Sequence, residues 1–362
     1  MTAAPTMRAA IFAGHGGPEV VHTANVPRPE PGPGEARVAV RAVALNHLDL
    51  WVRRGLPGLE LPLPHVGGAD VAGVVDALGA GVEGWRVGDE VVLNPSLPCR
   101  ACAACRAGET TRCARYRILG EHVTGGLAEA VVVPADRLHP KPPNLDFVHA
   151  AAVPLAFQTA WRALVTRAAI RPGEDVLVLG ASGGVATAVV QVAKLAGARV
   201  IAVTSSPERV EAVRALGAEV VIDRNAGPWS KAAWLATGRR GADVVVENVG
   251  AATWPDSLRS LRRGGRLVTY GATTGYLAET DLRYLFYKQL SLLGSTMATD
   301  AEFEAVMRLV SSGALRPVVG LVLPLEEAAE AHARLEAGEV FGKVVLEVGE
   351  AGGAREPAGS PQ

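Results

Sequence analysis

The feature that most constrains the fold is a regular alternation of short apolar runs and amphipathic segments that starts near residue 171. Strands are predicted at Asp175–Gly180 and Arg199–Thr204, with a glycine-rich turn and a helix through Val189–Leu195 between them. A helix over Pro207–Leu216 and a strand at Val220–Asp223 continue the alternation. Later strands are predicted at Asp243–Asn248 and Arg266–Gly271. Elements in this order bury their apolar faces in a parallel sheet with helices on both faces, so this part is predicted to be an α/β doubly wound sheet.

The first part of the chain has a pattern that is typical of β structure. Short apolar runs such as Ala36–Ala44 and Val71–Ala77 are separated by glycine and proline, which favour turns. After the α/β part, the sequence predicts a helix over Glu302–Val310 and a strand near residues 342–346. Residues 350–362 are rich in Gly, Pro and Ala and are predicted to be a disordered tail.

Size and charge exclude several classes of function. The 362 residues suffice for two domains with separate cores, and the formal net charge of −1 comes without basic or acidic blocks, so no nucleic-acid partner is expected. The apolar runs are too short to cross a bilayer, so no membrane partner is expected. The first residues do not have the layout of a signal peptide, and we expect a cytoplasmic protein with reduced thiols.

All four cysteines lie in one short stretch. Cys99, Cys102, Cys105 and Cys113 have the spacing C-x2-C-x2-C-x7-C, which suits one tetrahedral site with four thiolate ligands. The prediction is one structural zinc ion per chain, in a lobe over about residues 95–115. An iron–sulfur cluster is an alternative, because cysteines at these intervals also open ferredoxin motifs, although the ending C-x3-C-P is missing. Two disulfides are a second alternative, which a reducing compartment disfavours.

The turn after the first strand of the α/β part has the layout of a dinucleotide-binding loop. It lies between a strand and a helix, where backbone N–H groups and the helix N-terminus bind a pyrophosphate. Gly183 lets the phosphate approach the backbone, and Ala186 is small enough for the helix to pack against the strand. The residues predicted to bind the cofactor here are Ala181, Ser182, Gly183, Gly184 and Val185.

The end of the second strand of this unit indicates which dinucleotide is bound. NAD enzymes usually place Asp or Glu there to hold the ribose hydroxyls. The residues found here instead are Thr204, Ser205 and Ser206. Because guanidinium pairs bidentately with phosphate, Arg209 and Arg224 predict a site for the 2′-phosphate of NADP(H). The alternatives are an ordinary solvated role for Arg209 and binding of NAD(H), which Glu208 favours.

Together these features resemble the medium-chain dehydrogenase/reductase family over nearly the whole chain. The matching parts are the β-rich start, the cysteine lobe, Gly126–Glu129 (GLAE), the dinucleotide unit and Phe341–Leu346 (FGKVVL). The resemblance implies a GroES-like catalytic domain over residues 1–155, a Rossmann domain over residues 156–297 and a return to the first domain over residues 298–349. It also implies that the cysteine lobe is the structural zinc site of the alcohol dehydrogenases. Relatives are dimers or tetramers, so a homodimer joined through the edge strand near Ser291–Thr296 is expected.

The resemblance does not extend to the catalytic zinc site of the alcohol dehydrogenases. Asn46 stands where they have the cysteine of a C-x-[ST]-D motif, and Leu48 stands where they have the hydroxyl of the proton relay. Gly68–Asp70 (GAD) replaces their Gly-His-Glu, and Leu155 replaces their second cysteine. Because a catalytic zinc needs three protein ligands, the sequence predicts an active site without metal.

These replacements resemble the quinone oxidoreductase and enoyl reductase branch, whose members use NADPH without metal. The predicted function is therefore zinc-independent hydride transfer from NADPH to an activated C=C bond or a quinone. The incoming charge spreads into an enolate, so a few hydrogen-bond donors suffice. Asn46 is predicted to offer its amide to the substrate carbonyl, and Trp51 to wall the pocket. The alternatives are a loop-fixing role for Asn46 and a core role for Trp51.

Further residues are predicted to bind the cofactor. His47 is expected to contact the pyrophosphate, as its counterparts in relatives do, and Thr159 the nicotinamide ring. Ligands gather at the carboxyl ends of parallel strands. This adds Asn248, Gly250, Gly271 and Ala272. Lys343, near the end of the chain, is expected to reach the cofactor as well.

Two other functions stay open on the sequence alone. His47, His65, Asp70 and His122 lie near the replaced ligands in the sequence, which leaves a zinc-dependent alcohol dehydrogenase with unusual ligands as one alternative. The other is a non-catalytic NADP-binding protein, because a fold alone does not establish activity. The predicted reductase and the alternative alcohol dehydrogenase would both act on a small-molecule substrate.

Overall fold

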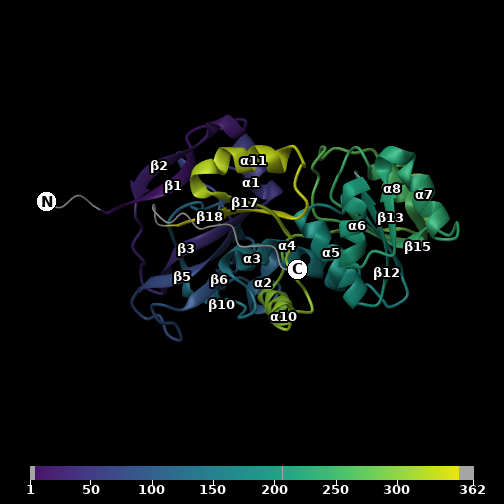
Figure 1. Cartoon of the computed structure of the whole chain (residues 1–362). Coiled ribbons are helices and arrows are strands. Elements are labelled where there is room, and N and C mark those ends of the chain that lie inside the picture. Colours follow the sequence, from purple (N-terminus) through teal and green to yellow (C-terminus); the bar gives the residue numbers. More distant parts are fainter. Residues whose placement is uncertain (1–4, 206, 350–362) are drawn as a thin grey trace.

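The chain folds into two lobes, each built around its own sheet (Figure 1). The computed structural model describes residues 5–205 and 207–349. The first lobe contains the β-rich start together with the end of the described chain, and the second lobe is formed by the segment between them. The predicted tail over residues 350–362 and the predicted cofactor ligand Ser206 lie outside the described residues.

The main sheet of the first lobe has the strand order β10-β6-β5-β3-β18-β17, with β9 also paired to β3. Its strands are β3 (Glu35–Leu45), β5 (Asp70–Leu78), β6 (Glu90–Leu93), β9 (Ala130–Pro134), β10 (Leu138–Pro140), β17 (Val319–Pro324) and β18 (Lys343–Glu347). Alternate residues of β3, such as Ala36, Val38 and Val40, are buried, as expected for a strand with one face on a core. β18 runs antiparallel to β3 with Val344 opposite Leu45, which brings the end of the chain beside its first third.

Smaller elements complete the first lobe. A second sheet has the order β2-β1-β4, and two short strands form a separate pair beside the cysteine lobe. These strands are β1 (Thr6–Phe12), β2 (Val21–Pro27), β4 (His65–Val66), β7 (Ser96–Leu97) and β8 (Arg117–Ile118). The helices are α1 (His47–Arg54), α2 (Ala103–Arg106), α3 (Phe147–Ala151), α4 (Pro154–Trp161), α10 (Asp300–Ser311) and α11 (Ala328–Glu336). In Figure 1, α11 lies near α1, β1 and β2, although it comes from the other end of the chain.

The second lobe is a parallel six-stranded sheet with the order β13-β12-β11-β14-β15-β16. Its strands are β11 (Asp175–Val178), β12 (Arg199–Thr204), β13 (Val220–Asp223), β14 (Ala242–Glu247), β15 (Leu261–Thr269) and β16 (Ser291–Gly294). Its helices are α5 (Gly184–Leu195), α6 (Pro207–Leu216), α7 (Trp229–Ala236), α8 (Trp254–Ser260) and α9 (Leu282–Lys288). Val189 of α5 and Val213 of α6 share one core, whereas Ala233 of α7 and Leu258 of α8 share another. The predicted α/β fold with a doubly wound parallel sheet is confirmed.

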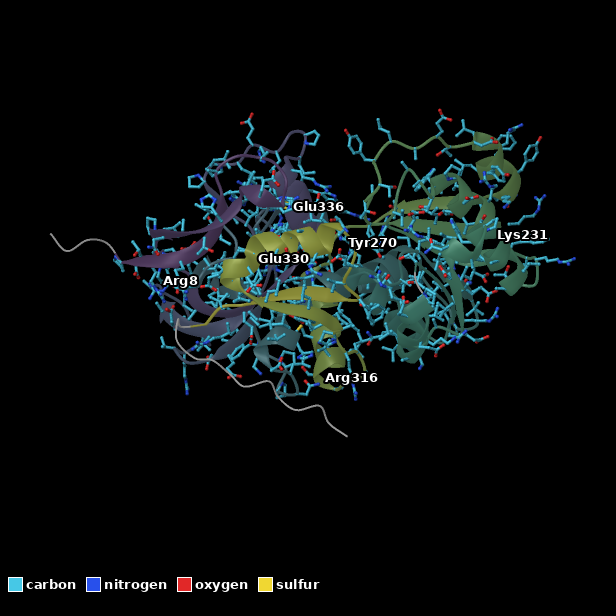
Figure 2. All side chains as sticks on the ribbon, turned by 45° about the horizontal axis from the view of Figure 1, so that its top comes forward. Arg8, Lys231, Tyr270, Arg316, Glu330 and Glu336 are labelled. Atoms are coloured by element: carbon cyan, nitrogen blue, oxygen red, sulfur yellow. The ribbon has the colours of Figure 1, made fainter. Side chains whose placement is uncertain are left out.

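The lobes meet at the carboxyl ends of the parallel strands. The N–H of Gly342 donates to the carbonyl of Ser182 at 2.8 Å, which ties the start of β18 to the glycine-rich loop after β11. Figure 2 shows Tyr270, at the end of β15, near this junction. The domain boundaries at residues 155 and 297 stay predictions. Within the described ranges, every helix is too short or too polar to cross a membrane.

Candidate active site

A cleft between the lobes gathers most of the predicted site residues. It consists of two pockets, with volumes of about 160 Å³ and about 290 Å³. Both pockets are lined by His47, Gly183, Gly184, Asn248, Thr273, Leu335 and Gly342. Because they share these walls, they form one elongated cavity along the carboxyl ends of the parallel strands, where such folds bind their ligands.

The larger pocket lies over the glycine-rich loop and the end of β12. Ser182, Thr204, Ser205, Arg209 and Arg224 line it, as predicted. Arg209 donates to Ser182 Oγ at 3.3 Å and to the carbonyl oxygens of residues 338 and 339 at 2.8 Å each. These contacts hold its guanidinium at the pocket wall. An arginine fixed in this way can receive an anionic group without first losing much side-chain entropy.

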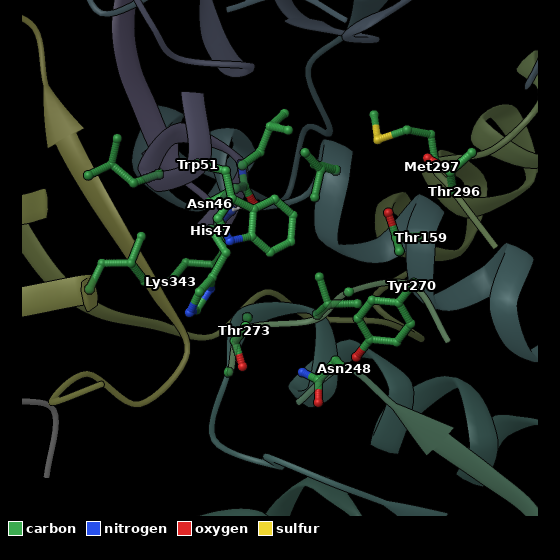
Figure 3. A pocket seen from close by; sticks show the side chains of 18 of the residues that line it. Asn46, His47, Trp51, Thr159, Asn248, Tyr270, Thr273, Thr296, Met297 and Lys343 are labelled. Carbon is green, nitrogen blue, oxygen red and sulfur yellow. Dashed lines mark hydrogen bonds between the residues drawn. The ribbon is translucent and has the colours of Figure 1, made fainter. Parts of the chain in front are cut away.

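The smaller pocket is mainly apolar and contains three buried oxygen atoms without a partner. Among the described residues, Thr159 Oγ1, Asn248 Oδ1 and the Tyr270 hydroxyl have no hydrogen bond. Figure 3 shows these three side chains on one side of the pocket, opposite Asn46, His47, Trp51 and Lys343. Buried polar groups are normally paired, so these atoms fit a polar ligand such as a nicotinamide ring with its carboxamide. The glycine-rich loop and these unpaired atoms together fit a dinucleotide.

At the position of the replaced metal ligands, three side chains form a closed network. Lys343 Nζ lies 3.0 Å from Asp70 Oδ2 and 2.5 Å from Asn46 Oδ1, and Asn46 Nδ2 donates to Asp70 Oδ2 at 3.0 Å. The other oxygen of Asp70 accepts the N–H of Leu155 at 2.8 Å. All three side chains are buried, and Asp70 is fully so. A cation, a carboxylate and an amide therefore occupy the site that a metal and its ligands occupy in the zinc enzymes.

This network changes the interpretation of Asn46. Both ends of its amide are engaged, since the oxygen accepts from Lys343 and the nitrogen donates to Asp70. An ammonium group has three N–H donors, and only two of those of Lys343 have partners among the described residues. Lys343 therefore keeps one donor for a ligand of the pocket that it lines, whereas Asn46 Nδ2 also donates to the carbonyl of Ala44 at 3.4 Å. The role of Asn46 as a donor to the substrate carbonyl stays a prediction.

Burial shifts the pKa values of two groups beside this network. Burial raises the pKa of Asp49 to about 6, against hydrogen bonds from the N–H groups of Asn46 and Gly68. Burial, together with the positive charges of Lys343 and Arg54, lowers the pKa of His47. His47 is therefore neutral at pH 7 and can donate a hydrogen bond to a phosphate without carrying charge.

Most of the predicted residues that the structure describes line the cleft, and three of them do not. Asn46, Trp51, Thr159, Val185, Gly271 and Lys343 line the smaller pocket, in addition to the residues named above. Ala181, Gly250 and Ala272 lie outside both linings. Ala181 is fully buried behind the loop, and Gly250 packs against Ala272 in the loop after β14. The roles of all these residues stay predictions.

Several residues that line the smaller pocket were not predicted from the sequence. The smaller pocket is also lined by Tyr270, Thr273, Thr296, Met297 and Leu335. Tyr270 directly precedes Gly271, so the rule that ligands gather at strand ends covers it equally. Thr296 and Met297 follow β16, the edge strand, and the same rule applies. Leu335 lies on α11, and no local signal in the sequence connects this helix with the cleft.

The four cysteine sulfur atoms converge away from the cleft. Their sulfur atoms all lie within 4.8 Å of one another, with Cys102 Sγ 3.5 Å and Cys99 Sγ 4.0 Å from Cys105 Sγ. Sulfurs around a tetrahedral zinc with 2.3 Å bonds are separated by about 3.8 Å, so these distances fit. Backbone N–H groups of Ala101 and Cys102 lower the pKa of Cys99 to about 5, which favours the thiolate form that binds metal.

His65 and His122, two of the histidines proposed as replacement zinc ligands, contact backbone groups instead. His65 Nε2 lies 3.0 Å from the carbonyl of Gly120, and His122 Nδ1 accepts the N–H of Ile118 at 3.2 Å. Within residues 5–205 and 207–349, the four cysteines are the only group of three or more ligand atoms at metal-binding distance. The structure thus does not bring together His47, His65, Asp70 and His122 as one ligand set.

Comparisons with known proteins agree with this geometry. Residues 32–143 match the family model "Alcohol dehydrogenase GroES-like domain", and residues 184–312 match "Zinc-binding dehydrogenase". A protein named crotonyl-CoA reductase, from Streptomyces collinus, is 36% identical, and the match covers 88% of this chain and 80% of that protein. The chain therefore belongs to the medium-chain dehydrogenase/reductase family, as the resemblance predicted.

Two solved structures that are similar to this chain are described as different kinds of enzyme. One, described as an NAD-dependent alcohol dehydrogenase, is 51% identical with a TM-score of 0.92, and the match covers 95% of this chain and 100% of that chain. Another, a crotonyl-CoA carboxylase/reductase in complex with NADP, is 30% identical with a TM-score of 0.87, and the match covers 96% and 95%. The fold is thus shared by an alcohol dehydrogenase and a reductase, and the site residues must decide between them.

Proposed function

We propose that this protein is an NADPH-dependent reductase of α,β-unsaturated thioesters. The observation that carries this proposal is the buried Lys343–Asp70–Asn46 network where the zinc enzymes have metal ligands. It faces a largely apolar pocket that suits the acyl part of such a substrate. The named activity of the Streptomyces relative supports the thioester as substrate class. Quinones and enones remain related substrates to test.

In this reaction the protein side chains need only stabilise one developing negative charge. NADPH, when bound, supplies the hydride that reduces the β-carbon of the double bond. Negative charge then develops on the carbonyl oxygen of the thioester, and an N–H donor of Lys343 is placed to stabilise it. Asp70 and Asn46 fix the ammonium, and the N–H of Leu155 fixes Asp70. The α-carbon takes its proton from solvent.

A substrate comparison tests the proposal. We expect the purified protein to oxidise NADPH rapidly with crotonyl-CoA, and to reduce acetaldehyde or oxidise ethanol at least a hundredfold more slowly. Reduction of the double bond is confirmed by identifying butyryl-CoA as the product. A protein that turns over alcohols and leaves crotonyl-CoA unchanged would contradict the proposal.

The preference for NADPH is part of the proposal. Thr204 and Ser205 end β12 where an acid would hold the ribose of NAD, and Arg209 and Arg224 line the same pocket. The solved relative in complex with NADP supports this assignment. Lys343 also contacts the cofactor loop, because its aliphatic chain lies where a Cβ on Gly184 would be placed.

We further propose a structural zinc ion, a homodimer and a cytoplasmic location. The four converging sulfurs support the zinc. The dimer is supported by the edge strand β16, on which Leu292 is exposed, and by exposed apolar side chains in the segment that precedes it in the sequence, among them Phe286 and Tyr287. Such a patch beside an unpaired strand edge is typical of a surface that pairs with a second copy. Sedimentation would decide between monomer and dimer. Cell fractionation would test the cytoplasmic location.

One observation favours a second function. The solved structure described as an NAD-dependent alcohol dehydrogenase is 51% identical to this chain. If the present chain shares that activity, ethanol or a longer alcohol with NAD should be its best substrate pair. The assay above measures both reactions with one protein sample, and the ratio of the two rates decides between the functions.

A further inference from the structure

A third pocket shares Thr296 with the smaller pocket of the active site. It is lined by Thr111, Arg112, Arg162, Arg167, Gly294, Ser295 and Thr296. Thr296 lines the active-site pocket as well, so the two cavities are neighbours. We call this cavity, defined by those seven residues, the arginine pocket.

Three separate segments of the chain build the arginine pocket. Thr110–Arg112 is a 3₁₀ turn of the cysteine lobe, Arg162–Arg167 is a π-helical segment that follows α4, and Gly294 ends the edge strand β16. The π-helical segment brings both Arg162 and Arg167 to the cavity. π-helical turns are rare and occur frequently at functional sites.

Positive charge exceeds negative charge at this pocket. Arg162 has a side chain that is only 5% exposed, and it pairs with Glu302 at 2.7 Å and with Glu109 at 3.4 Å. Arg112 has only a 3.7 Å contact with Glu109. Glu302 stays ionised, because hydrogen bonds from Thr166, the N–H of Thr299 and Arg162 outweigh its burial and lower its pKa. Three arginines thus face two carboxylates.

Other donors at the pocket have no partner. Thr111 Oγ1 and Ser295 Oγ are buried and have no hydrogen bond among the described residues. Arg167 uses its Nε for the carbonyl of Gly294 at 2.7 Å, and no partner for its terminal nitrogen atoms occurs in the described part of the chain. Buried hydroxyls are normally paired, so two of them beside the guanidinium groups of Arg112 and Arg167 indicate a missing acceptor with several oxygen atoms.

We infer that the arginine pocket binds a phosphate group at the far end of the substrate. This inference rests on the proposed function, because it assigns the thioester to the phosphorylated class, of which coenzyme A thioesters are the small-molecule members. Arg112 and Arg167 bind the phosphate oxygens, and the hydroxyls of Thr111 and Ser295 donate to the same group. The acyl chain then enters the active site past Thr296.

The test compares a phosphorylated and a phosphate-free substrate. Crotonyl-CoA and S-crotonyl-N-acetylcysteamine carry the same reacting group, and the ratio of their kcat/KM values reports what the phosphates contribute. We expect Arg112→Gln with Arg167→Gln to lower this ratio at least tenfold, mainly through the KM for crotonyl-CoA. The control Arg86→Gln removes an exposed arginine from a loop of the first lobe and should leave the ratio unchanged.

Calorimetry with free coenzyme A separates this inference from the proposed function. We expect the double variant to bind coenzyme A at least tenfold more weakly than the wild type does. If the wild type reduces neither thioester, the proposed function is wrong, and the calorimetry still decides whether the pocket binds the phosphate. An unchanged ratio with unchanged affinity for coenzyme A overturns the inference. A shift in oligomeric state with an unchanged ratio also overturns it, because the arginines would then serve a contact between copies.

Discussion

Replacing Lys343 with methionine tests the central feature of the site. Methionine keeps most of the aliphatic chain but removes the ammonium, so Asp70 stays buried with only the donors from Asn46 and Leu155. Breaking a buried ion pair costs about 3–5 kcal/mol, and two remaining donors place the expected loss of stability near the lower end, about 3 kcal/mol. Removing one preorganised donor to a developing oxyanion lowers kcat by about 10²–10³.

A second variant separates the loss of stability from the loss of activity. Asp70→Asn combined with Lys343→Met removes both charges, so we expect stability to return to within about 1 kcal/mol of the wild type. Activity should stay low, because the donor is still missing. Urea unfolding gives the stabilities, and NADPH oxidation with crotonyl-CoA gives kcat.

A matched control comes from another buried lysine. Lys141 has a side chain that is 9% exposed and pairs with Glu90 at 3.2 Å, and it does not line the cleft. Lys141→Met should cost some stability and leave kcat unchanged. If folded Lys343→Met retains kcat within threefold of the wild type, the ammonium does not stabilise the transition state and the mechanism must be revised.

Three further predictions address the cofactor, the metal and the core. Arg209→Glu should raise the KM for NADPH at least tenfold and that for NADH less than threefold, whereas Arg214→Glu on the same helix should change neither; steady-state kinetics with both cofactors checks this. Elemental analysis should find one zinc per chain, and removal by a chelator or by Cys102→Ser should lower the melting temperature. Burial, assisted by the charge of Arg53, lowers the pKa of His332 from 6.5 to about 3. The unfolded chain therefore binds more protons below pH 6.5, stability falls as the pH falls, and His332→Leu should remove about 2 kcal/mol of the difference between pH 7 and pH 5 in urea unfolding.

The fold could be predicted because its signals are local. Each strand and helix of the α/β part carries its own periodicity, and the glycine-rich loop marks where the first strand ends. The cysteine cluster is equally local, since its four ligands lie within residues 99–113.

The chemistry of the active site could be predicted only in part. Asn46 and Asp70 stand at replaced ligand positions and Lys343 belongs to the motif at residues 341–346, but nothing in the sequence pairs them. Their contact depends on the register of β18 against β3, which places Val344 opposite Leu45 and so brings Lys343 beside Asn46. The arginine pocket depends in the same way on three distant segments and on a π-helical turn that no sequence pattern predicts.

The position of Lys343 also connects the catalytic network with the cofactor loop. The N–H of Gly342 donates to Ser182, and the side chain of Lys343 lies so close to Gly184 that a Cβ there would be 2.5 Å from Lys343 Cδ. The residue that supplies the donor is thus held by the loop that is expected to bind the pyrophosphate. Because a displacement of about 1 Å at a reacting group can cost two orders of magnitude in rate, we expect binding of the dinucleotide to affect the orientation of the ammonium. In this fold, an ammonium on β18 can supply the electrostatic stabilisation that a metal supplies in the zinc enzymes, because the start of β18 adjoins both the glycine-rich loop and the smaller pocket.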